Sequence, residues 1–190
     1  MRLITIRLLT LSVLSCVALV VAAGQLPAPP VKSGLWETRM SALDAEGHEV
    51  APPEPAALSK MPPEARARMA DAMKARGLSM PDASGATKAC FTKETFESGT
   101  WQQMASDAGC TTKFSTRSSA TWKWHSSCTS LNSESDGEVV FNSPESYRVK
   151  VTTTAMVMGK TNTSTRIVQA KWLGPDCGDI KPFTPPGARK

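Results

Sequence analysis

Apolar and polar positions alternate along most of the second half of the chain, which is the period of half-buried β-strands. The clearest hairpin joins 110–117 to 121–128, with Phe114 facing Trp124 and Cys110 facing Cys128. The same pattern predicts further strands over 34–42, 87–92, 138–142, 147–158 and 161–173. We expect a loop over 131–137 and a two-residue type II′ turn at Gly159 and Lys160. Together these segments predict an antiparallel meander.

A helical period replaces the alternation after Pro62. Pro62 and Pro63 suit a first helical turn, and Gly77 suits a left-handed stop. The apolar stripe of this helix is thin, being made of Ala65, Met69, Ala72 and Met73. A second helix is expected to start at the N-cap Thr92 and to run to about Ala105. The fold class is therefore mainly β (α+β): an antiparallel meander sheet or a partly closed barrel with one or two short helices.

The N-terminus has the layout of a secretory signal. Arg2 and Arg7 precede an uncharged, mostly apolar run over 8–23 that ends in small residues, so we expect cleavage after Ala23. The run is shorter than the roughly 20 residues that span a bilayer, so the mature protein is not expected to cross a membrane. Lipid attachment at Cys16 is disfavoured, because it would leave mostly apolar residues on the mature side. The protein is expected in the periplasm or outside the cell.

These observations divide the chain into segments. Residues 1–23 form the signal peptide, 24–33 a proline-rich lead, 34–181 a single domain, and 182–190 a loose tail. The turn-rich segment and the first helix, 43–80, form a flexible insert. The formal net charge falls from +5 to +3 when Arg2 and Arg7 leave, and the remaining cations are scattered. We therefore expect no nucleic-acid partner.

The mature chain keeps the cysteines Cys90, Cys110, Cys128 and Cys177, an even count that implies two disulfides in an exported protein. A four-thiolate zinc site is disfavoured because no C-x2-C pair is present. Strand direction puts Cys110 and Cys128 at one end of the sheet and Cys177 at the other. This favours the disulfide pairing Cys110–Cys128 with Cys90–Cys177. The alternative pairing, Cys90–Cys110 with Cys128–Cys177, stays open because a helix could fold back on the sheet.

No catalytic constellation is evident, and we expect neither an enzyme nor a cofactor. The sequence has no G-x-S-x-G elbow, no phosphate-binding loop and no H-E-x-x-H pair. His48 lies in a turn-rich segment, and alternation puts His125 on the face opposite Trp124. No metal site is predicted from these residues.

A non-catalytic binding module for an apolar or envelope ligand is the favoured function. Its candidate ligand-binding residues are Trp36, Phe114, Trp122, Trp124 and Trp172. The alternative is that these side chains only pack in the hydrophobic core. One alternative is an envelope protein-interaction or maintenance factor that uses the 43–80 insert as its contact. Another is Cu(I) binding by thioethers, in which only Met69 and Met73 share a helix face. The remaining methionines in that argument are Met61, Met80, Met156 and Met158.

Several segments in order resemble one family. They are 32–37 (KSGLWE), 61–64 (MPPE) leading into the helix that ends at Gly77, 89–94 (ACFTKE), Cys110, the Trp-rich strand into Cys128, 143–147 (SPESY) and 171–179 (KWLGPDCGD). Together they resemble the bacterial exported family known as domain of unknown function 3617. The resemblance implies an exported, cysteine-stapled, β-rich protein. It supplies no activity and no catalytic residues.

Overall fold

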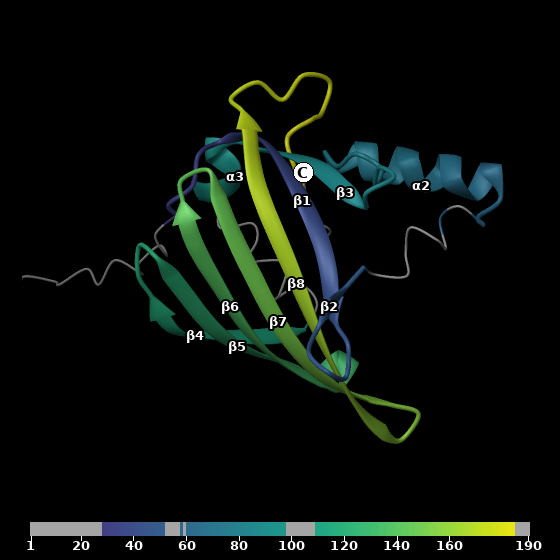
Figure 1. The fold of residues 1–190 in the computed structure, drawn as a ribbon, viewed down its shortest axis with the longest axis vertical. Helices are drawn as coiled ribbons and strands as arrows, with labels where there is room; N and C mark the ends of the chain where they lie inside the picture. The colour runs from purple at the N-terminus through teal and green to yellow at the C-terminus, as the bar shows by residue number, and fades with distance from the viewer. Residues whose placement is uncertain (1–27, 52–57, 59, 98–108, 185–190) are drawn as a thin grey trace, which may run out of the picture.

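The computed structural model describes residues 28–51, 58, 60–97 and 109–184, whose strands form one antiparallel sheet (Figure 1). The strands are β1 (Gly34–Leu43), β2 (Glu49–Val50), β3 (Ala86–Phe91), β4 (Cys110–Arg117), β5 (Thr121–Cys128), β6 (Ser133–Ser143), β7 (Ser146–Val157) and β8 (Lys160–Gly174). Their order across the sheet is β2-β1-β8-β7-β6-β5-β4, and β3 also pairs with β1. The predicted mainly β class with an antiparallel meander is confirmed.

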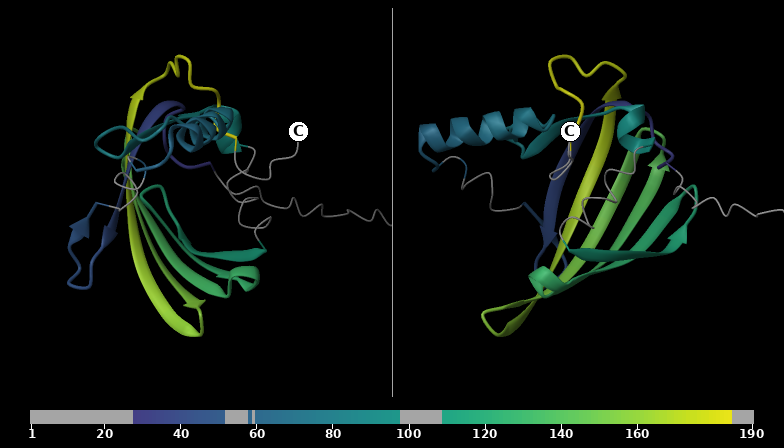
Figure 2. Two further views of the ribbon diagram at one scale, coloured as in Figure 1. Left: turned by 90° about the vertical axis from the view of Figure 1, so that its right-hand side faces the viewer. Right: turned by 180° about the vertical axis from the view of Figure 1, so that it is seen from behind.

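The sheet is strongly curved but does not close. β1 joins the meander at β8, and β2 and β3 share the other edge of β1, while β4 ends the sheet on the far side. Figure 2 shows the strands curling so that one face is concave, with the helices near its upper end. Of the two predicted architectures, the open meander sheet is therefore the one observed.

The predicted hairpin is confirmed in register, since Phe114 pairs with Trp124 and Cys110 with Cys128. The predicted loop over 131–137 is wrong, because β6 begins at Ser133 and pairs with both β5 and β7. The 3-10 turn η1 (Thr129–Leu131) and Asn132 separate it from β5. The segment carries serines, acids and Gly137, which have low strand propensity, but ladder hydrogen bonds on both sides outweigh that preference.

The tight turn between β7 and β8 is also displaced from its prediction. Val157 pairs with Lys160, so Met158 and Gly159 are the two central residues, with φ of 50° and 75°. Positive φ at both positions defines a type I′ turn rather than the type II′ turn expected at Gly159 and Lys160. Methionine rarely adopts this conformation, which explains why the sequence did not mark it.

Both predicted helices are present. Helix α2 (Pro63–Ala75) ends at Gly77, whose φ is 75°, and the amide of Leu78 donates to the carbonyl of Met73 at 3.0 Å. This is the bonding of a Schellman stop. Helix α3 (Lys93–Glu97) is capped by Thr92, whose hydroxyl accepts the amide of Thr95 at 3.3 Å. Its predicted continuation to about Ala105 lies outside the described residues, as does the signal peptide.

The first residues of the predicted tail, 182–190, form backbone hydrogen bonds with the rest of the domain. The amide of Phe183 donates to the carbonyl of Cys90 at 2.7 Å, and that of Thr184 donates to the carbonyl of Arg76 at 2.9 Å. A Cβ at Gly77 would lie 2.3 Å from the carbonyl oxygen of Lys181, so only glycine allows this approach. The chain after Lys181 is therefore packed against β3 and the end of α2 as far as Thr184.

The two disulfides are Cys90–Cys177 and Cys110–Cys128, the favoured pairing. Cys128 lies beside Cys110 at the open end of the β4–β5 hairpin, whereas Cys177 follows β8 at the opposite end of the sheet. Cys90 lies in β3, which pairs with β1 next to the end of β8. The bridges therefore secure the two ends of the sheet separately.

Candidate functional site

The register of the ladders assigns each strand residue to one of two faces, because directly paired residues share a face. One face, called the concave face below, is made of successive cross-strand rungs. Ordered from the Cys177 end to the Cys110 end, these rungs are Trp36–Trp172; Thr38–Ala170–Tyr147–Phe141; Met40–Val168–Val149–Val139–Trp122–Arg117; Ala42–Arg166–Val151–Gly137–Trp124–Phe114; Ser164–Thr153–Ser135–Ser126–Thr112; and Asn162–Ala155–Ser133–Cys128–Cys110. The fifth of these, made only of Ser and Thr, is called the hydroxyl rung.

Ring contacts identify this face as the concave one. The Trp36 and Tyr147 ring centroids lie 5.2 Å apart, although β8 separates their strands. Strands two places apart are roughly 9.6 Å from one another, so these side chains converge, as they do inside a curved sheet. Phe91, on the same face, stacks on Phe96 of α3, and α3 lies on the concave side in Figure 2.

A continuous row of aromatic rings crosses the concave face. Tyr147 contacts Phe141 at 6.2 Å, Phe141 contacts Trp122 at 5.2 Å, and Trp122 contacts Phe114 at 6.2 Å between ring centroids. Trp36 joins the row through Tyr147. The row runs from β1 to β4, so it holds together strands that are far apart in the sequence.

Trp124 lies across Gly137 on the neighbouring strand. A Cβ built on Gly137 would be 2.1 Å from two atoms of the Trp124 ring, so the indole rests on the bare backbone of β6. Glycine is required here by the ring that covers it and not by a positive φ.

The predicted ligand-binding residues fall into three groups. Trp36 and Trp122 are 0% and 5% exposed and belong to the core. Phe114 and Trp124 are only partly buried and lie on the same rung. Trp172 lies at the sheet end, where its indole N–H donates to the carbonyl of Ser33 at 3.0 Å and its ring is covered by the ammonium of Lys32.

Sequence reasoning missed several residues of this face. Phe141 and Tyr147 complete the aromatic row, and their alternation was visible, but nothing in the sequence showed that β1 pairs with β8 and so brings Trp36 to Tyr147. Arg117 was also missed, because a β-bulge after Phe114 turns it onto the concave face. Its guanidinium lies 4.2 Å from the ring centroid of Trp122 and 4.6 Å from that of Phe114. Burial lowers the pKa of Arg117.

The Tyr147 hydroxyl is a polar group within the aromatic row, whose indole N–H groups at Trp36 and Trp122 donate to backbone carbonyls. Within the part of the chain that the structure describes, the contacts of this side chain are its ring contacts with Trp36 and Phe141. Burial among the rings raises the pKa of Tyr147 to about 12, because the phenolate would be poorly solvated there. The hydroxyl therefore stays protonated at neutral pH.

The opposite, convex face is charged and its ions pair with one another. Arg148 forms an ion pair with Glu49, and hydrogen bonds from Arg148 and then Ser41 lower the pKa of that carboxyl. Here His125 lies 2.9 Å from Asp136, with both side chains exposed. The rung neighbours of this pair are Lys113 and Thr152, so it has no neighbouring serine or cysteine nucleophile on its rung. The absence of catalysis stays a prediction.

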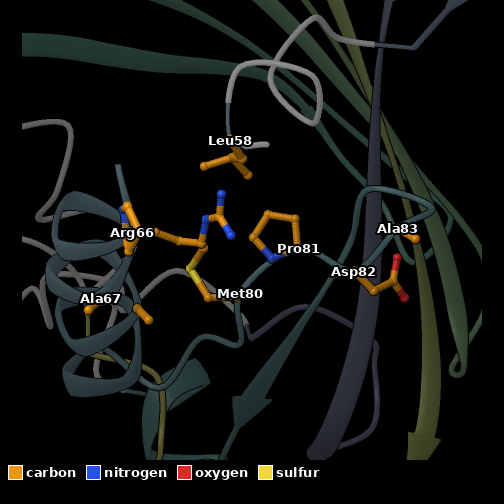
Figure 3. A pocket seen from close by; sticks show the side chains of 9 residues that line it. Leu58, Arg66, Ala67, Met80, Pro81, Asp82 and Ala83 are labelled. Atoms are coloured by element: carbon orange, nitrogen blue, oxygen red, sulfur yellow. The ribbon is translucent and has the colours of Figure 1, made fainter. Parts of the chain in front are cut away.

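A separate groove of about 620 Å³ runs along α2 (Figure 3). It is lined by Leu58, Pro63, Arg66, Ala67, Ala70, Met80, Pro81, Asp82 and Ala83. The Asp82 carboxylate accepts hydrogen bonds from Ser84 and from the amide of Ala86, and these lower its pKa. That carboxylate therefore organises its own turn.

Two further structural facts bear on the alternatives. Among the described residues, no three His, Cys, Asp or Glu side chains gather closely enough to hold a metal ion. The methionines also separate into distant groups. Helix α2 lies far from the tip of the β7–β8 hairpin (Figures 1 and 2), where Met156 lies near the end of β7 and Met158 lies in the turn. None of the described helices has the length and apolar composition needed to cross a bilayer.

Comparison with known proteins gives a family but no activity. No curated protein and no solved structure matches the chain. The family described as protein of unknown function DUF3617 matches residues 31–177, a span that includes β1, the aromatic row and all four disulfide cysteines. The chain belongs to the DUF3617 family.

Proposed function

We propose that this protein is an exported, non-catalytic binding module that takes an apolar ligand onto the concave face of its sheet. The observation that carries the proposal is the incomplete burial of that face at its centre. Val149, Val151, Val168 and Trp124 are only partly buried there, and Met40 is 41% exposed. An apolar sheet face is normally covered by a second layer, and among the described segments α3 covers only its upper end (Figure 2).

The two groups of aromatic residues then have different roles. Trp36 and Trp122 form the floor that fixes the curvature, because they are buried in the ring row. Phe114 and Trp124, which are partly accessible, contact the ligand together with the central valines. Trp172, engaged with Ser33 and Lys32 at the sheet end, is not part of this contact.

The test compares one valine on each face. The oxidised protein is incubated with envelope lipid extract for native mass spectrometry, and titrated with a fluorescent dye that binds apolar surfaces. Val151→Gln should weaken dye binding about tenfold, because burying a valine contributes roughly 1.5–3 kcal/mol. Val140→Gln is the matched control, because Val140 is 37% exposed and lies on the convex face.

Both variants should keep the circular dichroism spectrum and both disulfides of the parent. An adduct that survives in Val140→Gln and is lost in Val151→Gln supports the proposal. If the parent protein takes up neither lipid nor dye, or if the two substitutions weaken dye binding equally, the proposed function is wrong.

A second candidate function, contact with an envelope protein, rests on α2. None of its residues is buried, and the groove described above runs along it. Ala67→Trp would fill this groove, whereas Ala75→Trp would add the same bulk at an exposed position away from it. Loss of crosslinked partners in the first variant alone would support this candidate, and unchanged crosslinking in both would exclude it.

A further inference from the structure

Charge is divided unequally between the two faces of the sheet. Every carboxylate on the described strands lies on the convex side: Glu37, Glu49, Glu134, Asp136 and Glu138. Between the Trp36 rung and the Cys110 rung, the described concave face carries only two charged side chains, Arg117 and Arg166. On the rungs that hold the partly exposed apolar residues, the charged side chains are therefore both cations.

Arg166 lies at the boundary between the apolar and polar parts of this face. Its rung holds Val151, Gly137 and Trp124, and the next rung toward Cys110 is the hydroxyl rung. The side chain is exposed, and a guanidinium nitrogen lies 3.8 Å from the sulfur of Met40. Within the described residues no carboxylate pairs with it.

Hydroxyls beside Arg166 add hydrogen-bonding groups at the same boundary. Thr112 bonds to Ser126 at 2.5 Å, and Ser135 bonds to Thr153 at 2.9 Å. A hydroxyl bonded to one neighbour still has an acceptor or donor position for a ligand. Toward the other end, the valine and aromatic rungs extend from Val151 to Trp36, over three steps of about 7 Å each.

We infer that the ligand of the concave face is a single-chain anionic amphiphile, a carboxylate bearing a hydrocarbon tail. The inference rests on the proposed function and adds the chemistry of the ligand. The carboxylate pairs with Arg166, whose planar fork suits two-point contact with an acid group, and it faces the hydroxyl rung. The tail lies along the central valines toward Tyr147. A flat bilayer surface cannot follow the concave centre, so the amphiphile is bound as a monomer.

The experiment titrates the oxidised protein with three probes that share one dodecyl chain, each below its micelle concentration. Dodecanoate is anionic, dodecanol is neutral and dodecyltrimethylammonium is cationic, and binding is followed by calorimetry and tryptophan fluorescence. We expect dodecanoate to bind about tenfold more tightly than dodecanol, since a hydrogen bond to a charged group contributes at least that factor. The cationic probe should bind most weakly.

Variants locate the effect. Arg166→Gln should remove the preference for dodecanoate and leave dodecanol binding unchanged, and Arg166→Lys should retain most of the preference. Lys171→Gln is the matched control, because Lys171 lies on the same strand, is exposed, and belongs to the convex face opposite Glu37. It changes the net charge by the same amount and should leave all three affinities unchanged.

The outcomes separate this inference from the proposed function. If dodecanoate and dodecanol bind equally, or if Arg166→Gln and Lys171→Gln weaken dodecanoate binding equally, the anionic ligand is excluded and the apolar binding module remains. If none of the probes binds, both are wrong.

Discussion

The contact between Trp124 and Gly137 gives the sharpest prediction for stability. Gly137 has an extended backbone that alanine can also adopt. If nothing touched the new methyl group, Gly137→Ala would therefore stabilise the protein by about 0.4–1 kcal/mol, because alanine lowers the conformational entropy of the unfolded chain. The new Cβ, however, would lie 2.1 Å from two atoms of the Trp124 ring. Moving the indole off β6 is an overpacking cost of about 1–3 kcal/mol. The expected net loss is about 1–2 kcal/mol.

Urea unfolding of the oxidised protein, followed by circular dichroism, measures this loss. Gly174→Ala is the control, because nothing lies within 4 Å of a Cβ at that position, and it should not destabilise. In a Trp124→Ala background Gly137→Ala should cost nothing, which gives a coupling energy of about 1–2 kcal/mol. If Gly137→Ala and Gly174→Ala change the free energy of unfolding equally in the parent protein, the Trp124 indole does not rest on β6. The arrangement of the concave face given above would then be incorrect.

Three further predictions concern other parts of the fold. Tyr147 is the only tyrosine, so absorbance of the phenolate should report a native pKa of about 12. Because the folded state holds this proton more tightly, stability should fall as pH rises from 10 to 12, by roughly 3 kcal/mol in total. A native pKa near 10 would contradict burial in the ring row. Replacing Cys90 and Cys177 by alanine should cost about 4.6 kcal/mol, against about 3.2 for the Cys110 and Cys128 pair, because their sequence separations are 87 and 18. Equal losses in denaturant unfolding would refute this chain-entropy account. Met158→Asn should raise stability by about 1 kcal/mol, since Met158 is 99% exposed with φ of 50°, a conformation that asparagine tolerates better. A lower midpoint of thermal unfolding would show that the methionine side chain stabilises the turn.

Local chemistry explains the elements that were predicted correctly. The β4–β5 hairpin alternates from Cys110 to Phe114 and from Trp122 to Cys128, and α2 has prolines at its start and Gly77 at its end, so each element is specified by residues close together in the chain. The prediction of a loop over 131–137 was wrong because contacts with distant segments, and not local chemistry, decide its structure. Its serines and Gly137 lie in a strand only because β5 and β7 flank it and because Trp124 covers the glycine. The position and type of the β7–β8 turn were predicted wrongly because methionine rarely adopts the positive φ that Met158 has here.

The candidate site was predictable in part. Aromatic residues at alternating positions predicted one apolar face, and strand direction predicted both disulfides, because antiparallel neighbours place their ends by simple reversal. The role of each aromatic residue was not predictable. Trp36 and Trp122 are buried and Trp172 lies at the sheet end, and these positions depend on pairings between strands distant in the sequence.

The sequence by itself determined the antiparallel meander, the helix before Gly77 and the family, because each depends on periodicity, turn residues or their order. It favoured the observed cysteine pairing, but the structure decided between the two pairings that the sequence left open. The tertiary structure decided which way the sheet curves and which charges its inner face holds. Strict alternation would leave Arg117 on the face opposite Phe114, and the bulge after Phe114 brings it to the same side. The pairing of β1 with β8 places Trp36 beside Tyr147. Contacts between segments distant along the chain made both arrangements, so no local pattern encodes them.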